Sequence, residues 1–365
     1  MKSYFSPNYS NARARFVAAA EALGTRNQSH TLPGFTGAEG EPLSLDTALF
    51  APPKARSLLV LTSAVHGVEG FCGSGCQLAF LHDTDMQRRA QAAGVAVLLL
   101  HAVNPYGFSH LHRTNEQNID INRNAIDFSQ PRADNPAYRE IRDWLIPEQW
   151  PETQQNAARK ATYIERNGEQ AYQRAVTTGQ YEDAQGLFYG GVAPAWSNLT
   201  VRKILREIGA DFSDIGWIDF HTGLGPYGHA EKIFAGRPGP DELPRARSWW
   251  GADVFAPFAG DSSSANVSGP LAGVIYDECA HARTTVLALE YGTVPVNDML
   301  NALRADQCLQ NHPDMPAAQR VAIKQVMRDA FYGDDDLWRG MILGQARVGI
   351  MQAIAGLAAK KLLRN

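Results

Sequence analysis

The motif with the clearest chemical meaning is His66-Gly-Val-Glu69, because a histidine and a glutamate three residues apart can bind the same metal ion. A His-x-x-Glu match is weak by itself. This one, however, follows an apolar run of strand length, residues 57–65, and precedes a helical pattern. In open α/β sheets, ligands bind beyond the carboxyl ends of the strands. A catalytic zinc ion takes three protein ligands in such a place and leaves a fourth position for water.

A second histidine and a second glutamate each follow a further apolar run. His221 comes directly after residues 215–220, and we expect it to be the third metal ligand. A lone histidine there would more often be structural, but the first motif favours the ligand interpretation. Glu290 follows residues 284–289, where an unpaired charge would be unfavourable to bury. It is either paired with an arginine or a general base that takes a proton from metal-bound water.

The polar segment 113–124 is the most specific part of the sequence. Ile119 and Ile121 alternate there with Asp120 and Asn122, which predicts a short, extended, half-buried segment in place of a solvated loop. The segment also carries arginines near both of its ends. A guanidinium group is a planar fork that suits a carboxylate or a developing oxyanion.

The elements that must position these residues are four apolar runs of strand length separated by helical patterns: residues 57–65, 95–103, 215–220 and 284–289. Continuous apolar strands that alternate with helices are typical of a parallel sheet covered on both faces. A helix is expected at residues 8–23, followed by turn-rich sequence to Pro53. We therefore predict an α/β fold with a mixed, largely parallel central sheet and helices on both faces.

We expect one domain over residues 1–365. The polar, helical pattern at about residues 136–209 is predicted as an insertion, because it lacks the apolar content for a core of its own. From about residue 296 the chain is expected to form helices, the last of which begins near Asp336 and is rich in Ile, Leu, Ala and Met. This last helix would pack on the sheet or on a partner subunit, so a homo-oligomer is a second interpretation.

The composition argues against several classes of function. A formal net charge of −4, without a basic run interleaved with aromatics, argues against nucleic acid as a partner. Residues 1–16 lack the apolar core of a signal peptide, and no stretch approaches about 18 apolar residues, so neither secretion nor a membrane span is expected. Four cysteines do not suggest a disulfide framework, which fits a cytoplasmic protein. Neither a Gly-x-Ser-x-Gly motif nor a phosphate-binding glycine motif is present.

The chemical motifs occur in the order found in the zinc carboxypeptidase superfamily: His66-x-x-Glu69, Arg113, Asn122-Arg123, His221 and Glu290. The sequence resembles the carboxypeptidase A-like metallopeptidases and their aspartoacylase relatives, and most of all a largely uncharacterised bacterial branch. The likeness covers about residues 57–295. It implies that His66, Glu69 and His221 bind one Zn²⁺ per chain and that Glu290 is the general base.

The same resemblance implies roles for the polar segment. Arg113 would polarise the scissile carbonyl and stabilise the oxyanion. Asn122 and Arg123 would bind the terminal carboxylate of the substrate. Asp120 would orient the first zinc-binding histidine, which fixes its tautomer and raises its basicity as a ligand.

The resemblance therefore implies a zinc-dependent hydrolase of the metallocarboxypeptidase type, which cleaves an amide or peptide bond next to a free carboxylate by general-base activation of zinc-bound water. Its substrate would be a small peptide or an N-acyl amino acid. Two alternatives stay open: an aspartoacylase-like deacylase of N-acyl amino acids, and a metal-binding relative without catalytic activity. The ligand set suits zinc without being exclusive to it. The mobile tyrosine of the carboxypeptidases has no counterpart at residues 265–269, and whether Tyr276 replaces it is left open.

Overall fold

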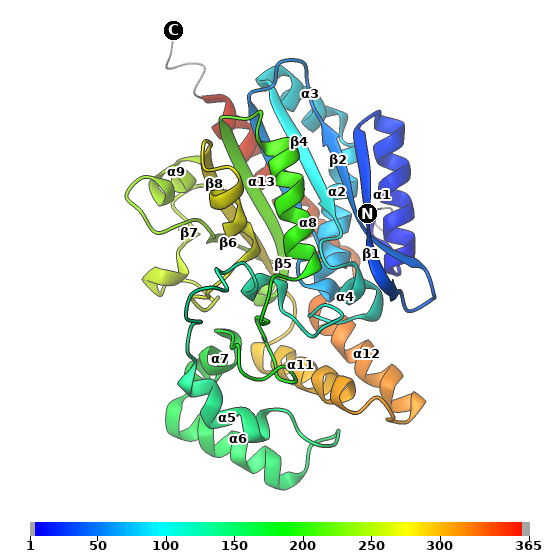
Figure 1. Ribbon diagram of the computed structural model, residues 1–365, viewed down its shortest axis with the longest axis vertical. Coiled ribbons are helices and arrows are strands. Elements are labelled where there is room, and N and C mark those ends of the chain that lie inside the picture. Colours follow the sequence, from blue (N-terminus) through cyan, green and yellow to red (C-terminus); the bar gives the residue numbers. More distant parts are fainter. Residues whose placement is uncertain (1–3, 360–365) are drawn as a thin grey trace.

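The computed structural model describes residues 4–359, and within them an eight-stranded sheet forms the centre of the protein (Figure 1). The strands are β1 (Arg26–Thr36), β2 (Pro42–Phe50), β3 (Ser57–Thr62), β4 (Val95–His101), β5 (Asp214–Tyr227), β6 (Ala230–Phe234), β7 (Val254–Phe255) and β8 (Arg283–Gly292). Their order across the sheet is β1-β2-β4-β3-β5-β8-β6-β7. The central strands β4, β3, β5 and β8 are parallel, whereas β1 with β2, β2 with β4, and β6 with β8 pair antiparallel.

Helices cover both faces of this sheet. The α-helices of the described residues, whether on a face of the sheet or beyond its end, are α1 (Tyr9–Leu23), α2 (Gly70–His82), α3 (Thr84–Ala93), α4 (Pro105–His110), α5 (Pro136–Leu145), α6 (Gln154–Asn167), α7 (Glu169–Thr177), α8 (Trp196–Ile204), α9 (Glu242–Trp250), α10 (Ile275–Glu278), α11 (Val296–Asn311), α12 (Ala317–Phe331) and α13 (Asp336–Ala358). Leu59 and Leu61 of β3 face a core shared with α1, α2, α3, α9 and α13. Leu58 and Val60 face the other core, shared with α8 and α10, and Figure 1 shows α8 on the near side of the sheet. Both faces are buried, which explains why the strand sequence is continuously apolar.

The predicted fold class is confirmed: the sheet is mixed and mostly parallel, and four of its strands are those expected from the apolar runs. The expectation of turns up to Pro53 is wrong, because this segment forms the hairpin of β1 and β2. β1 is an edge strand with mostly exposed, polar side chains. β2 is buried but contains Asp46, which accepts a hydrogen bond of 2.7 Å from Nε of Arg13. Neither strand therefore shows the apolar run on which the prediction depended.

Further helices lie beyond the carboxyl ends of the parallel strands, in the lower part of Figure 1. Helices α5 and α7, from the segment predicted as an insertion, share an apolar core with α11 and α12. Trp144 and Tyr172 from the first pair meet Leu303 and Met327 from the second in this core. Helix α8, from the same predicted segment, packs on the sheet instead. Helices α5, α7, α11 and α12 thus build one layer around the end of the sheet.

Among the described residues, one helix, α13, is long and apolar enough to cross a membrane by length and composition alone. The sequence shows no uninterrupted apolar stretch there, because Arg339 and Arg347 lie within the helix. Arg347 pairs with Asp83 and Asp85 at the start of α3. The buried side of α13 packs on α2, α3 and α9 and on the sheet.

Candidate metal centre

His66 and Glu69 lie in the turn that connects β3 to α2. β3 ends at Thr62, so His66 is in the following loop and not at the end of the strand as predicted. Glu69 ends a short 3-10 turn that leads directly into α2. A Cβ atom on Gly67 would lie 2.0 Å from the backbone of Gly107, so only glycine fits at this point. This close contact fixes the turn that presents both side chains.

His221 and Glu290 come from adjacent parallel strands. β5 continues through Tyr227, so His221 lies within the strand and not directly after its end, as residues 215–220 had suggested. His221 on β5 and Glu290 on β8 are register partners, and Glu231 on β6 is the partner of Glu290 on the other side. Register partners project to the same face of a sheet, so His221 and Glu290 stand side by side.

The side chains of His66, Glu69 and His221 converge on one point. Their candidate donor atoms lie within 4.8 Å of one another, and all three residues are buried. The carboxylate oxygens of Glu69 lie 2.8 Å from Nδ1 of His66 and 3.0 Å from Nδ1 of His221. The two Nδ1 atoms are 3.2 Å apart. The structure thus brings together the three residues predicted as metal ligands.

A carboxylate stands behind each histidine. Nε2 of His221 lies 2.7 Å from Oδ2 of Asp219, and Nε2 of His66 lies 3.3 Å from Oδ1 of Asp120. Asp219 also accepts a hydrogen bond of 2.6 Å from the hydroxyl of Thr62. A carboxylate at Nε2 favours the tautomer protonated there, which leaves the lone pair of Nδ1 available to a metal ion. Asp120 is predicted for this role from the sequence. Asp219 is not, although its place two residues before His221 on the same strand face could have indicated it.

The charges of this cluster fit a metal cation. Burial would raise the pKa of Glu69, but His66 and His221 hold it well below its usual value. Burial would lower the pKa of His221, but Asp219 and Glu69 outweigh burial and raise it well above its usual value. With both imidazoles protonated at Nε2, two nitrogen lone pairs and a carboxylate would repel one another. A proton relieves only part of that repulsion. One Zn²⁺ would satisfy all three donors, and catalytic zinc sites commonly use His and Glu ligands.

Glu290 is a buried carboxyl group beside the ligand cluster. Burial raises the pKa of Glu290 to about 8, and the negative charge of Glu69 adds to the rise. Oε1 of Glu290 accepts a hydrogen bond of 3.0 Å from the backbone N–H of Leu224. In the described part of the chain Glu290 is in no ion pair, which disfavours the interpretation as an arginine-paired carboxylate. A raised pKa in a buried position is typical of a catalytic acid or base.

Arg113 is largely buried against the ligand cluster. Its Nε donates to Asp120 at 3.0 Å and its Nη1 to Glu69 at 3.3 Å. Its Nη2 lies 2.7 Å from Nε2 of His66. A guanidinium can only donate, so this last contact needs a His66 tautomer with an unprotonated Nε2. The tautomer that binds metal through Nδ1 carries its proton at Nε2, so it releases Nη2 of Arg113 for another acceptor.

Arg123 and Asn122 lie farther along the same segment. Arg123 donates to backbone carbonyl oxygens, from Nη2 to Thr177 at 2.5 Å, from Nη1 to Asn122 at 2.9 Å and from Nε to Thr178 at 3.2 Å. These bonds engage three of the five N–H groups of the guanidinium. Burial lowers the pKa of Arg123. The side-chain oxygen of Asn122 accepts a hydrogen bond of 2.8 Å from the backbone N–H of Leu271, which leaves its NH₂ group for a ligand.

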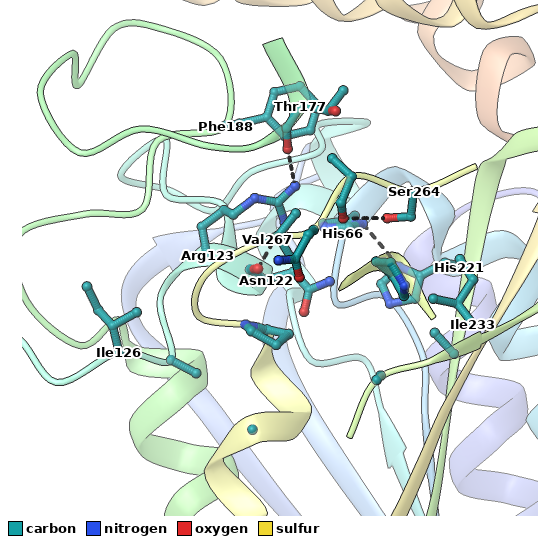
Figure 2. Close-up of a pocket in the computed structure, with 18 of the residues that line it drawn as sticks. His66, Asn122, Arg123, Ile126, Thr177, Phe188, His221, Ile233, Ser264 and Val267 are labelled. Carbon is teal, nitrogen blue, oxygen red and sulfur yellow. Dashed lines mark hydrogen bonds between the residues drawn. The ribbon is translucent and has the colours of Figure 1, made fainter. Parts of the chain in front are cut away.

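One cleft of about 1000 Å³ is lined by the three candidate ligands together with Glu290, Arg113, Asn122 and Arg123. Figure 2 shows Asn122 and Arg123 on one side of this pocket and His221 with Ile233 on the other. Ser264 and Val267, from the loop that precedes α10, also border it. A cleft of this volume is at the upper end of the range for small-molecule sites.

Tyr276 borders the cleft, but its hydroxyl is already engaged. The hydroxyl donates to Glu242 and accepts a hydrogen bond of 3.0 Å from the backbone N–H of Arg237. This engagement argues against Tyr276 as the replacement for the mobile tyrosine of the carboxypeptidases, the question that the sequence left open.

A family model described as "Protein of unknown function (DUF2817)" matches residues 5–345. No curated protein matches the sequence.

Several solved structures are similar to the chain at low identity. A metallo-carboxypeptidase from Burkholderia cenocepacia is 15% identical with a TM-score of 0.42, and the match covers 90% of this chain and 69% of that one. Carboxypeptidase A from Helicoverpa armigera is 12% identical with a TM-score of 0.43, covering 88% and 73%. The murein-tripeptide amidase MpaA from Escherichia coli O157 is 13% identical with a TM-score of 0.35, covering 87% and 97%.

Proposed function

This chain belongs to the DUF2817 family of proteins of unknown function, and we propose that it is a zinc-dependent hydrolase that cleaves an amide or peptide bond next to a free carboxylate. The observation that carries the proposal is the convergence of His66, Glu69 and His221 within 4.8 Å at the wall of a large cleft. Structural zinc sites take four protein ligands and are closed, whereas catalytic sites take three and open to substrate. The three ligands and the cleft favour the catalytic kind.

Glu290 is the proton carrier of the proposed reaction. A bound zinc ion would supply Lewis-acid chemistry, because it lowers the pKa of water and polarises a carbonyl group. Glu290 takes the proton of the attacking water and delivers it to the leaving nitrogen. The pKa of Glu290, about 8 beside the ligand cluster alone, would fall next to a divalent cation because opposite charge favours the carboxylate. It would then lie closer to the neutral range in which a general base is most effective.

Arg113 is the donor for the carbonyl oxygen of the substrate. Its guanidinium lies against Glu69 and Asp120 at the ligand cluster. Once the metal-binding tautomer of His66 releases Nη2, that N–H group can stabilise the negative charge that develops on the carbonyl oxygen. Donors of this kind, held in place before the reaction, are a large part of catalysis in acyl transfer.

Arg123 and Asn122 are the proposed partners of the substrate carboxylate. Each has N–H groups beyond those that the protein engages, and both line the cleft that contains the ligand cluster. The buried position of Arg123 strengthens a hydrogen bond to a carboxylate, because little water competes for it. This arrangement supports a substrate with a free carboxylate near the bond that is cleaved.

The test is hydrolysis by zinc-loaded protein of three sets of compounds: N-acetyl dipeptides, their C-terminal amides, and N-acyl single amino acids. The free acids should be cleaved on the order of 10–100-fold faster than the amides, the usual worth of a charge-assisted hydrogen bond. Cleavage of the N-acyl single amino acids alone would assign the deacylase activity instead. If zinc-loaded protein cleaves no compound in any set, the proposal is wrong.

A matched pair of variants controls this assay. His66→Ala should lose both zinc and activity. The control is His110→Ala. His110 lies in the neighbouring helix α4, where its ring is hydrogen-bonded to the backbone oxygen of Thr36, so this variant should keep both zinc and activity. Equal loss in the two variants would mean that the effect is not specific to the ligand cluster.

A further inference from the structure

Phe188 is a buried aromatic residue that contacts Arg113 and Arg123, two of the arginines that line the cleft. The Cζ atom of Arg113 lies 4.5 Å from the centroid of the Phe188 ring, and that of Arg123 lies 5.4 Å from it. Both distances are within the range of a cation–π interaction. Phe188 is only 2% exposed and lines the cleft. One ring therefore contacts the two groups to which the proposed chemistry assigns the carbonyl and the carboxylate of the substrate.

The backbone of Phe188 is held in an unfavourable conformation. Its φ is +53°, in the left-handed region that a bulky side chain rarely adopts. Two hydrogen bonds hold this part of the chain: the N–H of Gln180 donates to the carbonyl of Phe188 at 3.1 Å, and the N–H of Gly190 donates to the carbonyl of Gln180 at 2.8 Å. Such strain persists only where the surroundings impose it, and it concentrates at functional sites.

The segment of residues 180–190 also holds the loop that carries the arginines. The N–H of Asp120 donates to the carbonyl of Tyr189 at 2.7 Å. The hydroxyl of Tyr181 donates to the carbonyl of Arg123 at 2.7 Å. The segment therefore fixes the backbone of the arginine loop while the Phe188 ring contacts its side chains.

An aromatic ring supplies a constraint that the hydrogen bonds of the arginines lack. The N–H groups of a guanidinium lie at its edge, so the bonds of Arg113 to Asp120 and Glu69 and those of Arg123 to backbone oxygens act in its plane and oppose a tilt of that plane only through their bond angles. A ring face packed on the plane restricts that tilt. The negative face of the ring also attracts both cations, which opposes their mutual repulsion.

We infer that Phe188 is the positioning residue for Arg113 and Arg123: its ring sets the planes of the two guanidinium groups so that their unengaged N–H groups meet the substrate. The inference rests on the proposed function. It also gives the helical insertion a role, since the insertion delivers Phe188 to the end of the sheet.

The test compares Phe188→Leu with Phe188→Tyr and with Phe80→Leu. Phe188→Leu keeps an apolar side chain but removes the ring, and Phe188→Tyr restores a ring. Phe80→Leu is the matched control, because Phe80 is also buried but packs against Phe50 in the core between the sheet and helices α1, α2, α3, α9 and α13, away from the cleft. Each variant is assayed for zinc content, thermal stability, and kcat and KM with the best-cleaved N-acetyl dipeptide and its amide.

Phe188→Leu should retain zinc and lose on the order of 10–100-fold in kcat/KM, the scale of a misplaced catalytic group. Its KM should rise for the free acid and not for the amide, because Arg123 is proposed to bind the carboxylate. Phe188→Tyr should recover most of the loss, and Phe80→Leu should lower thermal stability without changing KM. If Phe188→Leu changes kcat and KM no more than Phe80→Leu does, the inference is overturned.

Crystal structures of the same variants separate this inference from the proposed function. The guanidinium groups of Arg113 and Arg123 should be displaced in Phe188→Leu and restored in Phe188→Tyr, whether or not the protein cleaves any compound. An unchanged arrangement in Phe188→Leu overturns the inference. An absence of hydrolysis by the wild-type protein overturns the proposed function alone. If Phe188→Leu does not fold, Phe188→Met, which also fills the space without a ring, is judged by the same criteria.

Discussion

His221 and Glu290 are register partners on the adjacent parallel strands β5 and β8, so their side chains project side by side from the same face of the sheet. The hydrogen bonds of the sheet, and not a flexible loop, therefore set the distance between a proposed metal ligand and the proposed base. Sites built on strands hold their geometry more closely than sites built on loops. The two roles also become separable by mutation, since His221 would bind the metal and Glu290 would move the proton.

Glu290→Gln should keep zinc and lose on the order of 10²–10⁴ in kcat, the contribution of a general acid or base. The amide oxygen of glutamine can still accept the hydrogen bond from Leu224, so the local structure should persist. Zinc content by elemental analysis and kcat in the peptide assay check both parts. Full activity in this variant would exclude Glu290 as the base.

Asp219→Asn should weaken zinc binding on the order of 10–100-fold, the usual effect of removing the group that orients a ligand histidine. The carboxylate lies 2.7 Å from Nε2 of His221 and holds the tautomer that offers Nδ1 to the metal. Competition against a fluorescent zinc chelator measures the affinity. Asp214→Asn is the control, because Asp214 begins the same strand and pairs with Arg283. Equal zinc affinity in the wild type and Asp219→Asn would contradict the assignment of Asp219.

Removal of zinc with a chelator should lower the stability of the wild-type protein. A ligand that binds only the folded state stabilises it by about 4 kcal/mol when the free ligand is about 1,000 times its Kd. Urea unfolding with and without added zinc measures the difference. His66→Ala should show no response to zinc. A response of the same size in the variant would place the stabilising zinc elsewhere.

Asp306 should make the stability of the protein fall in acid. It lies 2.7 Å from His112 and 2.6 Å from Lys324, in a buried cluster that joins α11 and α12 to the residue before Arg113. Burial would raise the pKa of Asp306, but His112 and Lys324 lower it to about 2. The pKa of an unfolded aspartate is about 3.9. The stabilisation, about 3 kcal/mol for a shift of this size, is therefore present above pH 4 and is lost as the pH falls through 2.

Urea unfolding of the wild type and Asp306→Asn at pH 6 and pH 3 tests this dependence. The gap in free energy of unfolding between the two proteins should narrow by about half at pH 3, because aspartate in the unfolded chain is by then mostly protonated. A gap that stays constant between the two pH values would show that Asp306 does not have the lowered pKa.

The sequence predicted the central sheet because β3, β4, β5 and β8 are buried on both faces and therefore continuously apolar. It did not predict the hairpin of β1 and β2. β1 is exposed at the edge of the sheet, and β2 buries Asp46 by pairing it with Arg13, so neither strand is recognisable by apolar content. Burial of a paired carboxylate depends on a partner distant in sequence.

The residues of the candidate site likewise include some that the sequence predicts and some that it does not. His66, Glu69 and His221 could be predicted because each follows an apolar run of strand length in the sequence. Asp219 could also be predicted, because side chains two residues apart on a strand lie on the same face and Asp219 is two residues before His221. Phe188 could not be predicted, because its contact with Arg113 depends on the path of a long segment outside the sheet and on a backbone conformation that no residue type near it indicates.

The most direct test of the metal centre is a crystal structure of zinc-soaked protein with diffraction data collected at the zinc absorption edge. One anomalous peak per chain should lie about 2.0–2.2 Å from Nδ1 of His66, Nδ1 of His221 and a carboxylate oxygen of Glu69. A peak at another position, or no peak among these three side chains in the presence of excess zinc, would contradict the central claim.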